Sequence, residues 1–546
     1  MPGLITSLLG VSEGKEASLK MSSGIVLPSL VGVASVLFAH KWWYAYVKST
    51  DKPWKMVPGR WFLLGHVPHF GSNERITEVL EGWADEHGQE TGCFEIAIGP
   101  SKIVVICKEG PAREVLKHRP VIVERMHKIS SAVNAAGVTG LLSAEGDQWK
   151  QEHKLVSATL NKKSVSDYLT VFKRIAPRLI TKWKNECREG RISNVEDDLA
   201  GAMADSITNV SMDLDFDFVN EPKSQMAVDV QNAVKGIIAR AFAPFSYWKI
   251  PIIGNNLDGI QSIVDRIFMS FNKRIHEIKS EVETSSGDDP QSTRSTFVHK
   301  LYQVMKSEKS HLTPERVIGN VMTLIFAGTD TTTRALTCVF YLLAQDETLQ
   351  EELREEACEF DLKSASTHDL YTKLPRLKSF LHEVHRWYNN PFLGLEVTRD
   401  IPVAGSIMPK GSHVFVMSRY MSISPMVTPP KDVPPGPRNA PHTEFCPRRW
   451  LVETKDGSKP ALSTTSPSSY NSTGFMGFGF GQRSCPGRHY SESLSYCILV
   501  EFLQTFGPFT LAPGVPKDAK FITNVLMVPD CKVRLSLQVD DKIMAQ

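Results

Sequence analysis

Apolar residues follow a helical period over much of the chain. Between residues 147 and 390 they recur every three or four positions, which predicts a series of amphipathic helices. Residues 94–107 form two short apolar runs around a Gly99-Pro100 turn and predict a β-hairpin, and residues 397–417 also have strand character. Alternating strand–helix–strand units are lacking. We therefore expect a mainly α fold with small β-sheets, and neither a Rossmann fold nor a barrel.

An uncharged segment lies near the N-terminus. Residues 21–39 contain no Asp, Glu, Lys or Arg, and at about 1.5 Å per residue such a helix just spans the hydrocarbon core of a bilayer. Aromatic residues follow at 42–44, where an interface belt would lie. We expect an N-terminal transmembrane helix with its flanks over 1–50 and one large body over 51–546; a buried core helix is the alternative. The basic residues after the segment favour a cytosolic body: Lys41, Lys48, Lys52, Lys55 and Arg60.

The composition narrows the class of protein. With 546 residues, 42% hydrophobic and 22% charged, the chain is globular and neither disordered nor fibrous. The formal net charge of +2 gives no general attraction to nucleic acid, so we expect no nucleic-acid partner. The nine cysteines include no CxxC pair, which argues against a structural zinc site and a disulfide framework.

A glycine-rich loop precedes a helical run near the C-terminus. Residues 477–488, GFGFGQRSCPGR, form a tight turn that presents Cys485 just before a helix, and their spacing does not fit a nucleotide-binding loop. Backbone N–H groups and the helix dipole favour a thiolate there, so we expect a lowered pKa for Cys485. Arg483 adds positive charge and Phe478 would shield the sulfur from water. A thiolate held in this way can ligate a metal, including the iron of haem.

The pattern Phe478-x-x-Gly481-x-Arg483-x-Cys485-x-Gly487 resembles the haem-binding signature of the cytochrome P-450 family. Five fixed residues of ordinary frequency would recur by chance about 10⁻⁴ times in such a chain. The resemblance implies a cytochrome P-450 fold, a single large domain that encloses haem b. It also implies Cys485 as the axial ligand of the iron, with the other four motif residues in the cofactor site. The alternative is a buried structural cysteine.

A second motif lies in a long predicted helix over residues 313–345, which begins with a cap, a proline and an acidic residue. Ala327 and Thr331 are four residues apart and share one face, so that face offers a gap beside a hydroxyl. The sequence AGTDTT resembles the family's oxygen-activation motif. It implies Thr331 as the hydroxyl that stabilises bound dioxygen, Asp330 as the proton-delivery partner and Ala327 in the cofactor pocket. A threonine-rich helix with a solvated aspartate is the alternative.

A third motif combines a glutamate with two arginines. Glu383 and Arg386 are three residues apart and can form a charge-assisted pair. They resemble the family's Glu-x-x-Arg element, whose third member matches Arg449 in FCPRRW. We expect a buried network with an architectural and not a catalytic role. His382 and His385 are one residue too close for HExxH and have no third ligand, so we exclude zinc.

Trp149 and His153 resemble the family's Trp-x-x-x-Arg element, which contacts a haem propionate. His153 replaces the usual arginine and, when neutral, donates one hydrogen bond instead of two; Lys154 is an alternative. Residues 392–397 contain no arginine, although many relatives place a second propionate contact there.

The motifs run in family order from Trp149 to Cys485. They imply a haem-thiolate monooxygenase that inserts one oxygen atom from O2 into an apolar, lipid- or terpenoid-like substrate. No flavin or nicotinamide motif is present, so the electrons must come from a partner. The implied donor is NADPH-cytochrome P-450 reductase, for an enzyme anchored in the endoplasmic reticulum membrane with its catalytic domain in the cytosol.

Two other functions remain as alternatives. One is a haem-thiolate isomerase or dehydratase acting on peroxides, which would not need Asp330 and Thr331. The other is a non-catalytic haem-binding membrane protein. A basic patch could bind an acidic redox partner, with an ordinary solvated surface as the alternative: Lys150, Lys154, Arg448 and Arg488.

Overall fold

The computed structural model describes most of the body of the chain. It describes residues 52–540 except 62–63, 72–74, 100, 244–245, 251–253, 285–295, 309–311, 425–439, 453–460, 463–475 and 524, together with 35, 38, 39 and 41. Among these residues, no helix has the length and apolar character needed to cross a membrane. The predicted anchor over 21–39 lies outside the described residues apart from 35, 38 and 39, which are helical.

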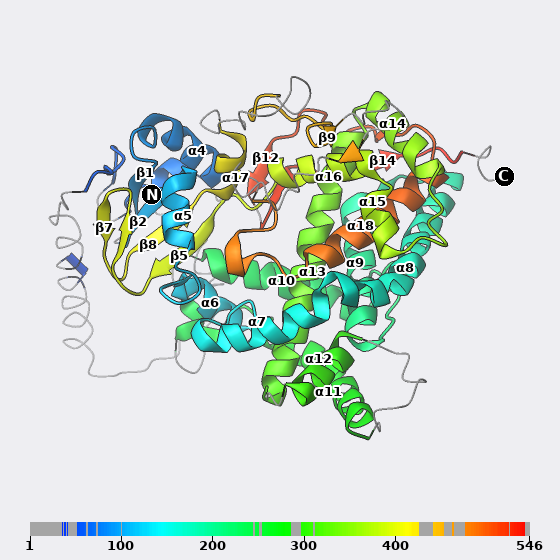
Figure 1. The fold of residues 1–546 in the computed structure, drawn as a ribbon, viewed down its shortest axis with the longest axis horizontal. Helices are drawn as coiled ribbons and strands as arrows, with labels where there is room; N and C mark the ends of the chain where they lie inside the picture. Colours follow the sequence, from blue (N-terminus) through cyan, green and yellow to red (C-terminus); the bar gives the residue numbers. More distant parts are fainter. Residues whose placement is uncertain are drawn as a thin grey trace, which may run out of the picture.

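A five-stranded sheet forms one side of the molecule (Figure 1). The strands β1 (Cys93–Ile98) and β2 (Ser101–Ile106) form the predicted antiparallel hairpin. Next to β2 lies β8 (His413–Val416), which runs parallel to it. Then follow β5 (Leu393–Val397) and β3 (Val123–Arg125), each antiparallel to its neighbour. The sheet thus brings strands from three distant parts of the chain together.

Short elements complete the sheet side and the edges of the molecule. The smaller sheets of the described residues pair β4 (Ser193–Asn194) and β11 (Thr510–Leu511) with β14 (Arg534–Ser536), β6 (Ile401–Val403) with β7 (Ser406–Met408), β9 (Leu451–Val452) with β10 (Ala461–Leu462), and β12 (Phe521–Thr523) with β13 (Met527–Pro529). The short helices near the main sheet are α3 (Val67–Phe70), α4 (Ile76–His87), α5 (Glu109–Leu116) and α17 (Ser418–Ile423).

The other side of the molecule is helical (Figure 1). Its helices are α6 (His127–Ala135), α7 (Gly146–Leu160), α8 (Lys162–Arg188), α9 (Val195–Met212), α10 (Gln225–Phe242), α11 (Ile260–Thr284), α12 (Phe297–Ser307), α13 (Pro314–Leu343), α14 (Glu347–Cys358), α15 (Thr367–Thr372), α16 (Pro375–Trp387) and α18 (Arg488–Thr505). Single 3-10 turns are η2 (Tyr247–Lys249), η3 (Gly254–Asn256) and η6 (Gly481–Arg483). The predicted class, mainly α with small sheets, is confirmed.

The long helix α13 passes through the middle of the helical side (Figure 1). Its N-terminus follows from the sequence: the Thr313 side chain accepts a hydrogen bond from the Arg316 amide, and Pro314 is the first helical residue. The helix continues without a break through Gly328. A Cβ there would lie 2.8 Å from Ile207 Cδ1 on α9, so this glycine permits close packing of two helices.

An aromatic cluster joins α8, α13 and α18 in the main hydrophobic core. Trp183, Phe340 and Phe502 pack edge to face, with ring centroids 4.9 to 5.8 Å apart. Helix α18 is buried along most of its length. The core therefore fixes α13 and α18 relative to each other, and these two helices carry the motifs of the candidate site.

Candidate active site

The loop before α18 has the tight turn expected from its glycines. Gly479 and Gly481 have φ values of +79° and +65°, which side chains with a Cβ rarely adopt. The Cys485 amide donates to the Phe478 carbonyl at 2.7 Å and closes the turn. Gly487 is the N-cap of α18, so Cys485 lies directly before the helix. The loop lies between the sheet side and the helical side of the molecule (Figure 1).

Cys485 is exposed as a whole residue, yet protein atoms lie densely around its sulfur. Burial raises its pKa above the ordinary value and outweighs two opposing influences, the Gly487 amide and the positive charge of Arg488. The expected lowering of this pKa is therefore wrong for the protein alone, because desolvation dominates. A positively charged iron at the sulfur would favour the thiolate.

The Phe478 ring has two close neighbours beside the loop, His385 and Arg488. The His385 ring is 4.6 Å from the Phe478 ring, and the Arg488 guanidinium is 5.2 Å from it. Burial lowers the pKa of His385 to about 4, so this histidine is neutral at pH 7. These neighbours restrict the position of the Phe478 ring, and its shielding of the Cys485 sulfur stays a prediction.

The motif on α13 presents one accessible position in a largely buried helix. Ala327 is exposed, whereas Phe326 and Thr332 are buried. The Thr331 hydroxyl donates to the Ala327 carbonyl at 2.7 Å. Its oxygen keeps acceptor capacity toward the gap that the short Ala327 side chain leaves.

A hydrogen bond ties the two motifs together. The hydroxyl of Thr332 on α13 donates to the hydroxyl of Ser491 on α18 at 3.1 Å. Thr332 directly follows Thr331, and Ser491 is six residues after Cys485. The structure therefore holds the start of α18 against the middle of α13, as the two predicted halves of the site require.

Trp149 and His153, one turn apart on α7, meet Arg483, which lies more than 300 residues further along the chain. The His153 ring stacks on the Trp149 ring with centroids 4.5 Å apart, and the Arg483 guanidinium lies 4.3 Å from the Trp149 ring. Burial and Arg483 lower the pKa of His153. Lys154, the alternative to His153, forms an ion pair with Glu308. His153 is therefore the one of the two that packs on Trp149.

Two arginines that sequence analysis missed belong to the same cluster. Burial, with Arg125 and Arg483 nearby, lowers the pKa of Arg119 to about 9. The carboxylate of Glu145 bonds both Arg483 and the Arg125 amide. The Nε atoms of Arg119, Arg125 and Arg483 are buried and have no hydrogen-bond partner among the described residues. Three guanidinium groups are thus accompanied by two nearby carboxylates, those of Glu145 and Glu124.

These unpartnered donors test the fit of haem to the site. Buried cations require anionic partners, and the two propionates of haem b are such partners. Arg125 lies opposite Leu395 in the β3–β5 register, so an arginine from β3 supplies the cation that the sequence of β5 lacks. The pairing of these strands was not visible in the sequence. The thiol, the accessible alanine and the cationic cluster together fit haem.

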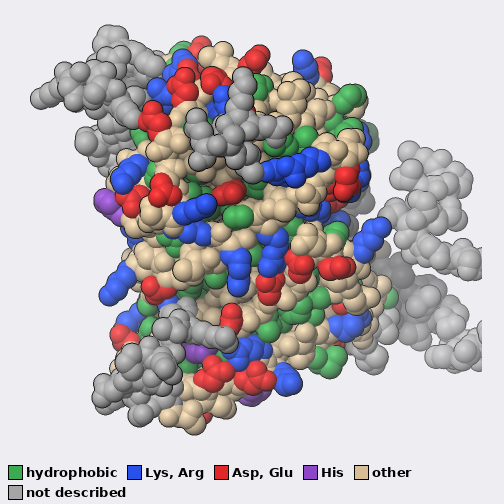
Figure 2. Space-filling model, turned by 90° about the vertical axis from the view of Figure 1, so that its right-hand side faces the viewer, with side chains coloured by type: hydrophobic (Ala, Val, Ile, Leu, Met, Phe, Trp, Pro, Cys, Tyr) green, Lys and Arg blue, Asp and Glu red, His purple; other side chains and the backbone are tan. Residues whose placement is uncertain are grey.

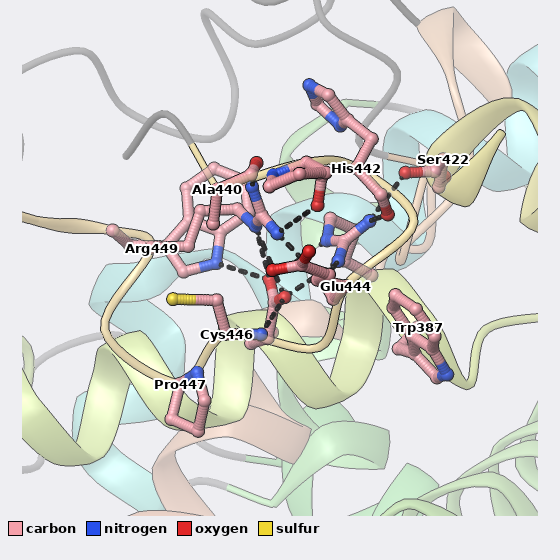
Figure 3. A network of polar contacts seen from close by, with 12 residues as sticks. Trp387, Ser422, Ala440, His442, Glu444, Cys446, Pro447 and Arg449 are labelled. Atoms are coloured by element: carbon pink, nitrogen blue, oxygen red, sulfur yellow. Dashed lines mark hydrogen bonds and ion pairs between the residues drawn. The ribbon is translucent and has the colours of Figure 1, made fainter. Parts of the chain in front are cut away.

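Glu383 is the centre of the third predicted motif. Figure 3 shows part of this polar network, with Arg449, Glu444 and Cys446 close to one another. Its carboxylate accepts two hydrogen bonds from Arg386, at 2.7 and 2.9 Å, and two from Arg449, at 3.2 and 3.3 Å. The Trp450 indole and the Cys446 amide also donate to it. All three charged residues are buried.

Both arginines also hold the chain that approaches them. Arg386 donates to the carbonyls of Ser422, His442 and Glu444 at 2.7 to 2.9 Å. Arg449 donates to the carbonyls of Ala440, Pro441 and Glu444. This network fastens an irregular segment to α16, an architectural arrangement.

The four basic residues proposed as a partner surface already have acidic partners. Lys150 pairs with Asp147, Lys154 with Glu308, Arg448 with Glu352 and Arg488 with Glu492. Figure 2 shows basic and acidic side chains interspersed over one face of the molecule. A strongly basic patch is therefore not formed by these four residues.

Comparisons with known proteins agree with this geometry. Residues 56–537 match the family model described as cytochrome P450. Cytochrome P450 3A12 of Canis lupus familiaris is 24% identical, over 71% of this chain and 74% of the relative. The mitochondrial sterol 26-hydroxylase of Rattus norvegicus is 23% identical, over 87% of this chain and 85% of the relative.

The fold is also similar to a solved structure. The crystal structure of the cytochrome P450DA haem domain matches with a TM-score of 0.71 and 17% identity, over 90% of this chain and 98% of that chain. The family match, which spans most of the sequence, decides the identity. The chain belongs to the cytochrome P450 family of haem b proteins and is a haem-thiolate monooxygenase.

Proposed function

We propose that this monooxygenase inserts one oxygen atom into an apolar, lipid- or terpenoid-like substrate, with electrons from NADPH-cytochrome P450 reductase. The observation that carries the site assignment is the Thr332–Ser491 hydrogen bond, because it supports the opposition of the Thr331 motif and the Cys485 loop. A lipid-like substrate is supported by the similarity to a protein named sterol 26-hydroxylase.

In this proposal the Cys485 thiolate would hold the iron of haem, and the turn that contains Phe478, Gly481 and Gly487 would position it. When bound, the haem supplies the activation of dioxygen. Asp330 carries a proton toward the hydroxyl of Thr331. The short side chain of Ala327 leaves space beside this hydroxyl for a hydrogen-bond partner. The Asp330 side chain is only 13% exposed, which limits the access of water to its carboxylate.

The propionates would be held by the cationic cluster of Trp149, His153 and Arg483, with Arg119 and Arg125 as additional donors. The unpartnered Nε atoms of the three arginines support this assignment. Since His153 is neutral, the arginines supply the charge. Glu383, Arg386 and Arg449 have no contact with reactants in this proposal and act through the fold.

For localisation, we infer a single-pass anchor over 1–50 in the endoplasmic reticulum membrane and a catalytic domain over 51–546 in the cytosol. Exposed apolar side chains near the start of the body support contact with a membrane surface. They are Trp61, Leu64 and Val67, which are 58%, 51% and 43% exposed. An apolar substrate dissolved in the bilayer would be close to such an enzyme.

The carbon monoxide difference spectrum of the reduced full chain tests the ligand assignment. We expect a band near about 450 nm, typical of thiolate ligation, and its loss in Cys485→Ala. A wild-type protein without this band would overturn the assignment of Cys485. Oxygen consumption with purified reductase and NADPH then tests the reaction. Turnover of a lipid peroxide without NADPH or O2 would favour an isomerase or dehydratase instead.

A binding screen tests the substrate class. We expect sterols and terpenoids to change the haem absorption spectrum at low concentration, and polar compounds of similar size to leave it unchanged. Selective binding of the polar compounds would contradict the proposed class. Flotation of the full chain and of residues 51–546 with phospholipid vesicles separates the contribution of the N-terminal segment.

A further inference from the structure

A buried ion pair lies behind the Cys485 loop and has no role in the proposed proton path. Arg488, the first residue of α18, donates through Nε to Glu492 at 2.9 Å, one helical turn later. The Glu492 side chain is only 3% exposed, and Arg488 is 25% exposed. A buried carboxylate is costly unless it is paired, so Arg488 compensates a charge that α18 carries inside the protein.

Lys378 and two histidines also lie near Glu492; the lysine adds positive charge, whereas the histidines carry little charge at pH 7. His382 lies 3.8 Å from the carboxylate and His489 lies 3.9 Å from it. Burial lowers the pKa of both histidines, which favours their neutral forms. Of the cations near Glu492, Arg488 is the one that donates a hydrogen bond to its carboxylate.

The ion pair is connected to the loop through Phe478. The Arg488 guanidinium lies 5.2 Å from the centre of the Phe478 ring, and the Phe478 carbonyl accepts the hydrogen bond of the Cys485 amide at 2.7 Å. Arg488 begins α18 three residues after Cys485, so its positive charge favours a thiolate there, whereas the negative charge of Glu492, one turn later, opposes it. Since the pair is largely buried, its charges are screened less than those of an exposed pair.

We propose that Arg488 and Glu492 are positioning residues that set the electron density on the Cys485 sulfur and thereby the reduction potential of the haem. The inference rests on the proposed ligation of the iron by Cys485. A cation beside the thiolate stabilises the reduced, more negative state and raises the potential, whereas an anion lowers it. Glu492 both fixes the guanidinium beside Phe478 and partly cancels its charge.

Redox titration of the full-length holoenzyme tests this inference. We expect Arg488→Gln to shift the midpoint potential in the negative direction by about 59 mV, which is a tenfold change for a one-electron couple. We expect Glu492→Gln to shift it in the positive direction. The midpoint potential of the double variant should return toward the wild-type value. Arg488→Lys keeps the positive charge, so its potential should stay close to that of the wild type.

A matched control is Arg448→Gln, which removes an arginine that is paired with Glu352 on the surface. It should leave the midpoint potential unchanged. An unchanged potential in Arg488→Gln, or shifts of the same sign in both single variants, would overturn the inference. If Glu492→Gln does not load haem, the midpoint potentials of Arg488→Gln and Arg488→Lys are compared instead. Equal potentials in these two variants would overturn the inference. A retained band near about 450 nm shows that thiolate ligation, and with it the proposed function, stands even where the potential does not move.

Discussion

Arg334 donates to both carboxylate oxygens of Asp330, one turn earlier on α13, with 2.9 Å for each contact. The two side chains are only 11% and 13% exposed. Glu196, on α9, lies 3.9 Å from the same guanidinium. The pair fixes a buried carboxylate directly before Thr331, and Glu196 is a second acid through which a proton could arrive from the surface.

Asp330→Asn should slow turnover by about 10²-fold, because an amide cannot carry the proton that a general acid transfers. Haem content and the carbon monoxide spectrum should stay unchanged, since Asp330 is on the opposite side from Cys485 in the proposed site. The measurement is product formation with saturating reductase. Asp265→Asn, an exposed aspartate on α11, is the control. Normal turnover in Asp330→Asn would remove this residue from the proton path.

Thr331→Ala should reduce the product formed per NADPH several-fold while NADPH oxidation continues. The variant loses the hydroxyl that faces the Ala327 gap, whereas the helix keeps its backbone hydrogen bonds. Thr337→Ala is the matched control, because its hydroxyl makes the same type of bond, to the Thr333 carbonyl at 2.9 Å, away from the gap. Thr331→Ser should restore coupling. Equal coupling in both alanine variants would argue against a role for Thr331.

The parts of this site that were predictable from sequence are local. The start of α13 follows from its cap and proline, and the turn before α18 follows from glycines at positive φ. The Glu383–Arg386 pair follows from a spacing of three on a helix. In each case residues close in sequence determine the geometry, so the sequence contains the necessary information.

The parts that were missed depend on distant segments. Arg125 reaches the cationic cluster only because β3 pairs with β5. Its partner in the register, Leu395, is 270 residues further along the chain. The raised pKa of Cys485 depends on how much protein surrounds the loop, not on its own sequence. The pairing of Lys154 with Glu308 likewise depends on the packing of α7 on α12.

Glu383→Gln should destabilise the protein by about 3–5 kcal/mol, because it leaves the buried Arg386 and Arg449 without their common carboxylate. Most natural domains have a total stability of about 5–15 kcal/mol, so little haem-loaded protein should accumulate. Urea unfolding and haem content measure the effect. Arg448→Gln removes an exposed ion pair with Glu352 and should cost about 0–1 kcal/mol. Similar losses in both variants would contradict the architectural role.

Arg125→Gln should weaken the retention of haem. A buried hydrogen bond to a charged group contributes about 1.5–3 kcal/mol, so we expect transfer of haem to an apomyoglobin acceptor to be about 10- to 100-fold faster. Arg266→Gln is the control: Arg266 on α11 pairs with Asp229 on α10, and the variant should transfer haem at the wild-type rate. An unchanged rate in Arg125→Gln would exclude a propionate contact from this residue.

His442 makes stability depend on pH on the acid side. Burial, with Arg386 and Arg449 nearby, lowers its pKa to about 4, whereas an unfolded histidine titrates near about 6.5. Between these values the unfolded chain binds the proton and the folded chain does not, so stability falls as the pH decreases through this window and is unaffected above it. His442→Gln should therefore lose about 2 kcal/mol less than the wild type between pH 7 and pH 5. Urea unfolding at the two pH values measures the difference, and parallel losses in both proteins would show that His442 does not titrate on unfolding.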